Sequence, residues 1–494
     1  MAERRLAERP AMQLVGLDED ATDAPPPVRS APEHLHDVAT GARSWASRRP
    51  AVASVVTVAV LALVAGVALA GPRWLTERER AAVLGPAAFV GAVATLRTIP
   101  EATWTADVNG TTAPVLVGDV LVASAGSVRH RDRRIVGLDA ISGALRWTVP
   151  LGTDPQPDAI DCHPTGEVVS CLAGPAPTPD PRDLAQVPDG EVGVATLWAI
   201  DPVHGVVRST HPVPGWIQSS AAAGSDLVVA AYAHGRLSVS RIEPVSGRQV
   251  WQTQRFATAG TTINGRIRLV VARALVMATD NDSTLLLDAA TGERQTHATD
   301  TLGIDQTRLA ANGTVVRTQF RLRGPVIVAS SSLSDGMGEP WLTAEGSVLS
   351  VDVSDGSSGL TFTSDGFGLD GVRAYRPGAD QQVWQTPTQA TRVSVDASDR
   401  VVVRNGGTVA GLAAEDGGVV WVRDLGAVSG PTVSDGRRVA VLSGGIDERP
   451  VLVALDLADG TLEWRLPLPA GTSRLVQLGT QLYAIGDERL VALR

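Results

Sequence analysis

A short turn followed by a tryptophan recurs along the chain beyond residue 100, and this repeat limits the possible folds more than any other feature of the sequence. The clearest copies are DAISGALRW, EPVSGRQVW and DLADGTLEW, which end at Trp147, Trp251 and Trp464. In each copy a glycine follows the acidic residue by four positions and the tryptophan follows the glycine by four. Weaker copies end at Trp384, Trp421, Ser209 and Thr296.

The spacing of these positions predicts the architecture. With Trp104 and Trp341 included, successive positions are separated by 43, 62, 42, 45, 45, 43, 37 and 43 residues. A period near 43 residues is the length of one blade of a β-propeller. The sequence therefore predicts an all-β chain over residues 101–494, folded as a closed β-propeller.

Each repeat has the chemistry of a β-hairpin. An apolar strand enters, an acidic residue and a glycine form the turn, and a second strand leaves with the tryptophan. The turn glycines supply the positive φ that such a turn requires: Gly143, Gly247, Gly292 and Gly460. The tryptophans are expected to pack between neighbouring sheets rather than against a cofactor: Trp104, Trp147, Trp251, Trp384, Trp421 and Trp464.

The two ends of the repeat region predict how the ring closes. Three strand-like runs follow Trp464, and the chain stops where a turn and a fourth strand are due. The segment around Trp104 is then the missing strand, and pairing it with the last runs would remove the exposed sheet edges. Because Trp341, in SLSDGMGEPW, lacks a clean strand and turn before it, we expect residues 297–384 to form one blade. The prediction is eight blades, with seven or nine as alternatives.

The only two cysteines, Cys162 and Cys171, predict one short disulfide. Closing a loop of about ten residues would stabilise the fold by roughly 2–3 kcal/mol, and the alternative is two buried thiols. The segment from Gly174 to Gly190 is rich in proline and is expected to be an exposed loop.

Residues 51–70 run for twenty positions without a charge, which matches the hydrocarbon core of a bilayer. We therefore expect a transmembrane helix over residues 50–72, a disordered cytoplasmic tail over residues 1–49 and a partly helical juxtamembrane linker over residues 73–100. A cleaved signal peptide ending near Ala70 is one alternative. A membrane hairpin with the second apolar run, residues 81–96, is another.

The orientation of this single-pass segment is predicted with the N-terminus in the cytoplasm and the propeller outside. Arginines flank the helix almost equally on both sides, so the positive-inside rule decides little. A disulfide favours an oxidising compartment, and this supports the outward orientation; the opposite orientation is the alternative. The net charge of −10 argues against nucleic acid as a partner, because phosphate binding needs a basic surface.

The acidic-x-x-[Ser/Thr]-Gly-x-x-x-Trp turn at this period resembles the pyrroloquinoline-quinone (PQQ) repeat of quinoprotein alcohol dehydrogenases and of non-catalytic propellers that assist outer-membrane assembly. The resemblance covers residues 101–494 and implies the propeller fold. It also implies what a catalytic member would contain, namely a disulfide between adjacent cysteines over the quinone and a calcium site of Glu, Asn and Asp. The sequence has no adjacent cysteines, and NDSTLLLD (Asn281 to Asp288) is better explained as a turn before a strand.

No catalytic residues are predicted. The sequence has no GxSxG elbow, Walker loop or HExxH motif, and the scattered histidines do not pair at ligand spacing. The leading hypothesis is a membrane-anchored, extracytoplasmic propeller that acts as a binding or scaffolding module, without a cofactor, for a protein, peptide or glycan of the cell envelope. The alternative hypothesis is a divergent oxidoreductase that uses PQQ and calcium, and a third is a sensor that signals through the tail.

Overall fold

The computed structural model describes residues 91–494 except 94, 110–111, 127–131, 153–158, 175–192, 234–235, 257–266, 280–283, 296–305, 311–312, 324–325, 337–339, 356–357, 365–370, 377–380, 398, 445–448 and 480. The chain divides into two units, residues 1–78 and 79–494, and the described residues belong to the second. The predicted tail, the predicted transmembrane helix and most of the linker lie outside the described residues. Within the described part of the chain, no helix is long and apolar enough to span a bilayer.

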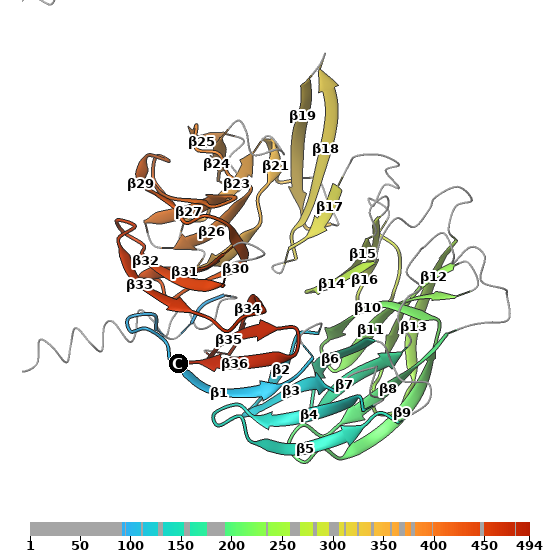
Figure 1. The fold of residues 1–494 in the computed structure, drawn as a ribbon. Helices are drawn as coiled ribbons and strands as arrows, with labels where there is room; N and C mark the ends of the chain where they lie inside the picture. The colour runs from blue at the N-terminus through green and yellow to red at the C-terminus, as the bar shows by residue number, and fades with distance from the viewer. Residues whose placement is uncertain are drawn as a thin grey trace, which may run out of the picture. The chain divides into compact units, whose positions relative to one another are not determined.

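The described residues form nine sheets that follow one another along the chain (Figure 1). The first sheet consists of β2 (Val115–Val117), β3 (Val120–Ala125), β4 (Arg134–Asp139) and β5 (Leu145–Pro150). The second consists of β6 (Ala159–Thr165), β7 (Val168–Gly174), β8 (Val194–Ile200) and β9 (Val207–Pro214). The third consists of β10 (Trp216–Ala223), β11 (Asp226–Ala233), β12 (Arg236–Ile242) and β13 (Gln249–Phe256).

The next three sheets are less regular. The fourth has β14 (Arg268–Ala272), β15 (Leu275–Thr279) and β16 (Thr284–Asp288), and a single bridge from Leu287 to Arg294 stands in for a fourth strand. The fifth has β17 (Gln306–Leu309), β18 (Val315–Arg323), β19 (Val326–Ser334) and β20 (Leu342–Glu345). The sixth has β21 (Ser347–Val348), β23 (Thr361–Ser364), β24 (Val372–Tyr375) and β25 (Gln382–Thr386).

The last three sheets complete the series. The seventh has β22 (Val351–Ser354), β26 (Arg392–Ala397), β27 (Arg400–Asn405), β28 (Thr408–Ala413) and β29 (Val419–Asp424). The eighth has β30 (Val428–Ser434), β31 (Arg438–Ser443), β32 (Val451–Asp456) and β33 (Leu462–Pro467). The ninth has β34 (Thr472–Leu478), β35 (Gln481–Gly486), β36 (Arg489–Leu493) and, from the other end of the propeller, β1 (Ala102–Asp107).

Burial along the strands explains why apolar runs become second and third strands. All six residues of β3 are buried, because both faces of a middle strand pack against a neighbouring sheet. In the outermost strand β5 only Trp147 and Val149 are buried, and they alternate with exposed residues. The continuous and the alternating patterns therefore mark the inner and outer parts of a sheet.

The core consists of nine buried clusters in the described residues, and each cluster joins one sheet to the next. For example, one cluster joins Val122 of the first sheet to Cys171 of the second. Another joins Val316 of the fifth sheet to Tyr375 of the sixth. The ninth and first sheets share a cluster too, which closes the series into a ring. An all-β propeller, as predicted, is confirmed.

The predicted closure is also confirmed. β1 pairs antiparallel with β36, and Trp104 lies opposite Ala492 (Figure 1). Just beyond these strands, the Glu101 backbone N–H donates to the Arg494 carbonyl at 2.6 Å, and the Arg494 N–H donates to the Glu101 carbonyl at 3.0 Å. The ring is thus held at this sheet by hydrogen bonds between the two ends of the propeller.

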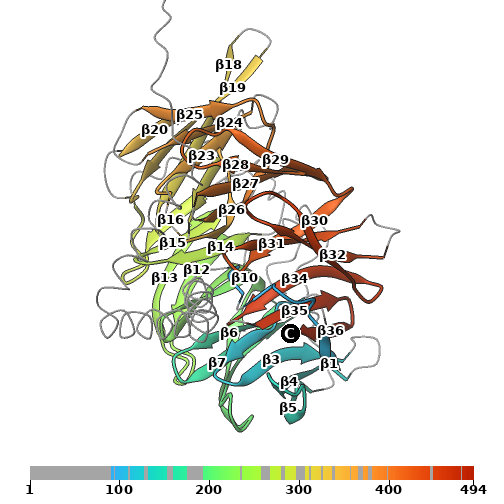
Figure 2. The same ribbon diagram turned by 90° about the vertical axis from the view of Figure 1, so that its left-hand side faces the viewer.

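The prediction of eight blades was wrong, because residues 297–384 form two sheets rather than one. Trp341 marks a real outer strand: it directly precedes β20, and its backbone N–H donates to the Leu333 carbonyl at 3.0 Å. The fifth sheet is irregular because β18 and β19 have nine residues each whereas β17 and β20 have four. This long hairpin extends beyond its neighbours in both views (Figures 1 and 2).

Two segments add a parallel strand on the free edge of an innermost strand. β22 runs parallel to β26, with Val353 opposite Val395. Residues 91–93 run parallel to β30, where the Val93 N–H donates to the Ser434 carbonyl at 2.9 Å and the Ser434 N–H donates to the Gly91 carbonyl at 3.1 Å. A Cβ at Gly91 would lie 2.7 Å from a methyl of Val353, so the two added segments are in contact.

Candidate functional site

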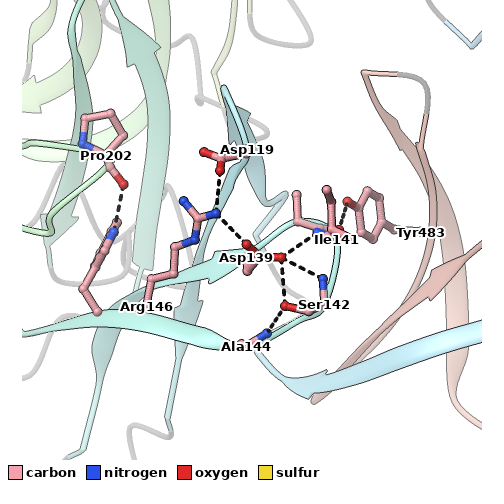
Figure 3. Close-up of polar contacts among 10 residues, drawn as sticks. Asp119, Asp139, Ile141, Ser142, Ala144, Arg146, Pro202 and Tyr483 are labelled. Atoms are coloured by element: carbon pink, nitrogen blue, oxygen red, sulfur yellow. Dashed lines mark hydrogen bonds and ion pairs between the residues drawn. The ribbon is translucent and has the colours of Figure 1, made fainter.

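The repeated turn is held by the acidic residue that begins it (Figure 3). In the first sheet, Asp139 Oδ1 accepts hydrogen bonds from the backbone N–H of Ile141 at 3.0 Å and of Ser142 at 2.8 Å, and from the Ser142 hydroxyl at 2.8 Å. Arg146 on the outer strand bonds both Asp139 and Asp119. The Arg146 guanidinium, followed by Ser142, holds the pKa of Asp139 well below its usual range. The acidic residue of the repeat therefore has a structural role.

The docked tryptophans other than Trp464 reach from their own sheet to the turn of the next. The Trp147 indole N–H donates to the carbonyl of Pro202, which Figure 3 labels, at 2.8 Å. A Cβ at Gly205 would lie 2.5 Å from the indole ring. Only a glycine at this turn position lets the indole approach so closely. The corresponding indole-to-carbonyl distances are 3.0 Å for Trp251 to Ala289, 2.9 Å for Trp384 to Ala414 and 3.1 Å for Trp421 to Leu457.

The remaining predicted repeat residues occupy related places. Trp104 packs over Gly143, and Trp251 and Trp421 pack over Gly292 and Gly460. Trp464 has no turn to contact, because the third and fourth strands of the ninth sheet come from opposite ends of the propeller. Its indole N–H donates instead to the Leu96 carbonyl at 2.7 Å. The segment before β1 thus takes the place of the missing turn.

The second sheet uses two residues where other sheets use one tryptophan. The Ser209 hydroxyl donates to the Pro244 carbonyl at 3.1 Å, and the His211 ring covers Gly247 and contacts the Val245 carbonyl at 3.0 Å. The sequence pattern located Ser209 but missed His211, because the pattern specifies only one position. Thr296, the equivalent in the fourth sheet, lies outside the described residues.

The predicted disulfide between Cys162 and Cys171 is confirmed. The two cysteines lie opposite each other on β6 and β7 and are 6% and 0% exposed. They belong to the cluster between the first and second sheets, beside Trp147. A disulfide enclosed in this way cannot cover a planar cofactor, so it does not fit the role that adjacent cysteines have in catalytic quinoproteins.

The calcium chemistry of those enzymes is not matched either. Among the described residues, no three His, Cys, Asp or Glu side chains are close enough to share a metal ion. Asp288, at the end of the Asn281 to Asp288 segment, accepts the backbone N–H of Ala290 at 2.9 Å and of Thr291 at 2.8 Å. It is the acidic residue of a repeat turn; residues 281–283 lie outside the described part.

One cluster has the residue types of a hydrolase triad but not its geometry. His163 Nε2 lies 3.0 Å from Ser220 Oγ and 3.1 Å from Asp161 Oδ2. The Ser220 hydroxyl also donates to Asp161 Oδ2 at 2.7 Å. In a working triad the acid and the serine contact different ring nitrogens. Burial acts to raise the pKa of Asp161, but the bonds to His163 and Ser220 outweigh it and lower that pKa. The cluster braces β6 against β10.

A second polar cluster ties the seventh sheet to the eighth. Asp352 accepts Arg392 Nη1 at 3.0 Å and the Thr432 backbone N–H at 3.1 Å. Nearby, Asp396 is 3% exposed; its Oδ2 accepts the Ser354 hydroxyl at 3.0 Å, and its Oδ1 has no hydrogen-bond partner. Burial raises the pKa of Asp396.

The outer edge of the seventh sheet is the most apolar outer strand among those with a docked tryptophan. Val419, Val420 and Val422 of β29 are 50%, 44% and 50% exposed. Valine stands on both sides of Trp421 in β29, whereas the tryptophans of β5, β13, β25 and β33 each have a polar or charged residue on at least one side. The adjacent outer strands add Val383 at 40% and Leu462 at 43%. Exposed valines and an unpaired backbone edge together make a surface suited to another polypeptide.

Known proteins were compared with the chain by sequence and by structure. No curated protein sequence gives a significant match. Among solved structures, BamB from Moraxella catarrhalis is 13% identical with a TM-score of 0.45, over 80% of this chain and 100% of that one. Quinohemoprotein alcohol dehydrogenase ADHIIG from Pseudomonas putida HK5 is 11% identical with a TM-score of 0.41, over 80% and 76%. The enzyme from Comamonas testosteroni is 10% identical with a TM-score of 0.40, over 80% and 76%.

The sequence itself matches one family model over most of the propeller. That model is described as outer membrane protein assembly factor BamB, and it matches residues 131–358 and 370–494. The match covers more than half of the chain and includes repeat turns from the first sheet to the eighth. The chain therefore belongs to the family described as outer membrane protein assembly factor BamB.

Proposed function

We propose that this protein is a membrane-anchored, extracytoplasmic propeller that binds a protein partner at the cell envelope through the outer edge of its seventh sheet. The observation that carries the proposal is the exposed valine edge of β29, formed by Val419, Val420 and Val422. An extended segment of a partner can pair with the free N–H and C=O groups of such an edge, and the valines contact its apolar side chains. Backbone pairing favours a protein or peptide over a glycan.

Membership of a family described as an outer membrane protein assembly factor supports a role in bringing proteins together. The uncharged run of residues 51–70 supports a membrane anchor, and the disulfide between Cys162 and Cys171 supports an oxidising compartment. The enclosed cysteines and the buried tryptophans give no support to a PQQ-dependent oxidoreductase.

The binding proposal is tested by site-specific photo-crosslinking in the source cells. A photoreactive residue at position 422 is compared with one at position 145, because Leu145 is 62% exposed on the outer strand of the first sheet. We expect a defined protein adduct from position 422 only, and we expect the Val420→Asp and Val419→Asp changes to abolish it. Identical adducts from both positions, or none from position 422, would count against the β29 edge.

The location is tested by protease treatment of intact cells and of cells with a permeabilised envelope. If the propeller faces outward, the protease should cleave it while the cytoplasmic membrane is still intact. If the protease cleaves the propeller only after that membrane is broken, the propeller lies in the cytoplasm, and a partner at the cell envelope is ruled out.

A further inference from the structure

One hairpin departs from a pattern that four other sheets share. The two-residue turn between the first and second strands begins with a glycine at positive φ in the first, second, third and ninth sheets: Gly118, Gly166, Gly224 and Gly479, with φ between 61° and 67°. The fourth sheet has Arg273 there, with φ 52°. Among the described residues, Arg273 is the only residue other than glycine with a positive φ. A side chain in this backbone conformation is strained, and strain of this kind often marks a functional position.

Arg273 lies at a pocket between the third and fourth sheets. The pocket has a volume of about 370 Å³ and is lined by Arg273, Arg241 and the small residues Ala222, Ala223, Val271 and Ala289. The side chain of Arg273 packs over the fifth sheet, where a Cβ at Gly313 would lie 2.9 Å from its Cδ. The strained turn therefore places Arg273 in the wall of an open pocket.

The second arginine is fixed by neighbouring groups. Arg241 Nε donates to Asp226 Oδ2 at 2.7 Å, and its Nη1 donates to the Ala289 carbonyl at 2.7 Å. Asp226 balances the charge of Arg241, and none of the described residues that line the pocket is a carboxylate. The pocket thus has an excess positive charge in a chain whose net charge is −10. The planar guanidinium group of an arginine matches the oxygens of a carboxylate or phosphate.

We propose that this pocket binds a small molecule carrying a carboxylate or phosphate group. The volume of about 370 Å³ lies at the lower end of the range for small-molecule pockets. The oxyanion contacts Arg273 and Arg241, and the rest of the ligand lies against the small residues of the wall, which include Gly224. This site lies on different sheets from the β29 edge and does not depend on it.

The test is isothermal titration calorimetry of the full-length protein with sodium phosphate and, separately, sodium succinate, with sodium chloride keeping the ionic strength constant. We expect saturable binding of at least one probe. Binding of phosphate alone assigns a phosphate ligand, and binding of succinate alone assigns a carboxylate. Arg273→Asn should weaken binding at least tenfold, because asparagine tolerates positive φ but carries no charge.

Arg437 provides a matched control, since it is an exposed arginine in the corresponding hairpin of the eighth sheet. Arg437→Asn should bind as the unchanged protein does. Arg273→Gly restores the glycine of the other turns, so it should fold and should also lose binding. The proposal is overturned if neither probe gives saturable heat, or if both Arg273 variants bind as tightly as the unchanged protein.

Discussion

The docked tryptophans can be tested against the exposed one at the same repeat position. Trp421 is 5% exposed; its indole N–H bonds the Leu457 carbonyl, and its ring fills the space beside Gly411 and Gly460. Trp421→Ala removes this packing and leaves a buried carbonyl unbonded, so we expect a loss of about 3–5 kcal/mol in the free energy of unfolding. For a ring of about 400 residues that unfolds cooperatively, about 4 kcal/mol lowers Tm by about 5 °C.

Trp341 is the matched control, because it lies at the same repeat position but is 37% exposed. Trp341→Ala should change the stability by about 1 kcal/mol or less. Trp421→Phe keeps most of the ring packing and loses the hydrogen bond, so it should fall between the two, at about 1–2 kcal/mol. Thermal unfolding of the full-length proteins, followed by circular dichroism, measures all three. Equal falls in Tm for Trp421→Ala and Trp341→Ala would refute the interlocking role of the tryptophan.

Three further predictions concern the disulfide, a buried acid and a packed glycine. The paired change of Cys162 and Cys171 to alanine should cost roughly 2–3 kcal/mol in urea denaturation, and adding reductant should then have no further effect. The pKa of Asp396 is raised in the folded state, so its burial destabilises the fold above that pKa, and stability falls as pH rises from the unfolded value through the raised one. Asp396→Asn should therefore raise Tm at pH 7 and flatten this part of the pH profile; an unchanged profile would contradict the assignment. Gly411→Ala should lower Tm in the same thermal assay, because its Cβ would lie 2.2 Å from the Trp421 ring.

The sequence predicted most of the ring because the interlocking residues are local and repeated. A turn of fixed length brings Gly143 or Gly460 to the end of a hairpin, and the tryptophan four residues later follows from strand geometry. The closing strand was predictable for a related reason. Only three strands follow the strand of Trp464, so the fourth strand of the last sheet was expected from the start of the propeller. Trp104 stands there at the repeat position.

The blade number was missed because the turn motif is absent before Trp341. Trp341 occupies a repeat position but does not enter a neighbouring turn, so its surroundings carry no glycine and acid at the usual spacing. The parallel additions at β22 and at residues 91–93 were also missed. Their partners lie about 40 and 340 residues away, and a two- to four-residue strand has no periodicity to detect.

The pocket with Arg273 and Arg241 was outside the reach of sequence reasoning for a different reason. The two arginines come from different sheets, and neither belongs to the turn-and-tryptophan motif. A signal was present, however, in the alignment of the hairpins: a position that holds glycine in four other sheets holds arginine in one. A residue that departs from an internal repeat can be recognised in a single sequence, without related sequences for comparison.

The pairing of β1 with β36 also sets an order of events during synthesis. β1 emerges from the ribosome early, but its partner is made almost 390 residues later. At about 5–20 residues per second, β1 waits about 20–80 s with both edges free. Sheets one to eight can form one after another in that interval, whereas the ninth can form only after β36 has been made. The final step of folding is therefore the pairing of β36 with β1, which was made much earlier. A substitution that weakens this pairing should leave a nearly complete but open ring that is prone to associate with other chains.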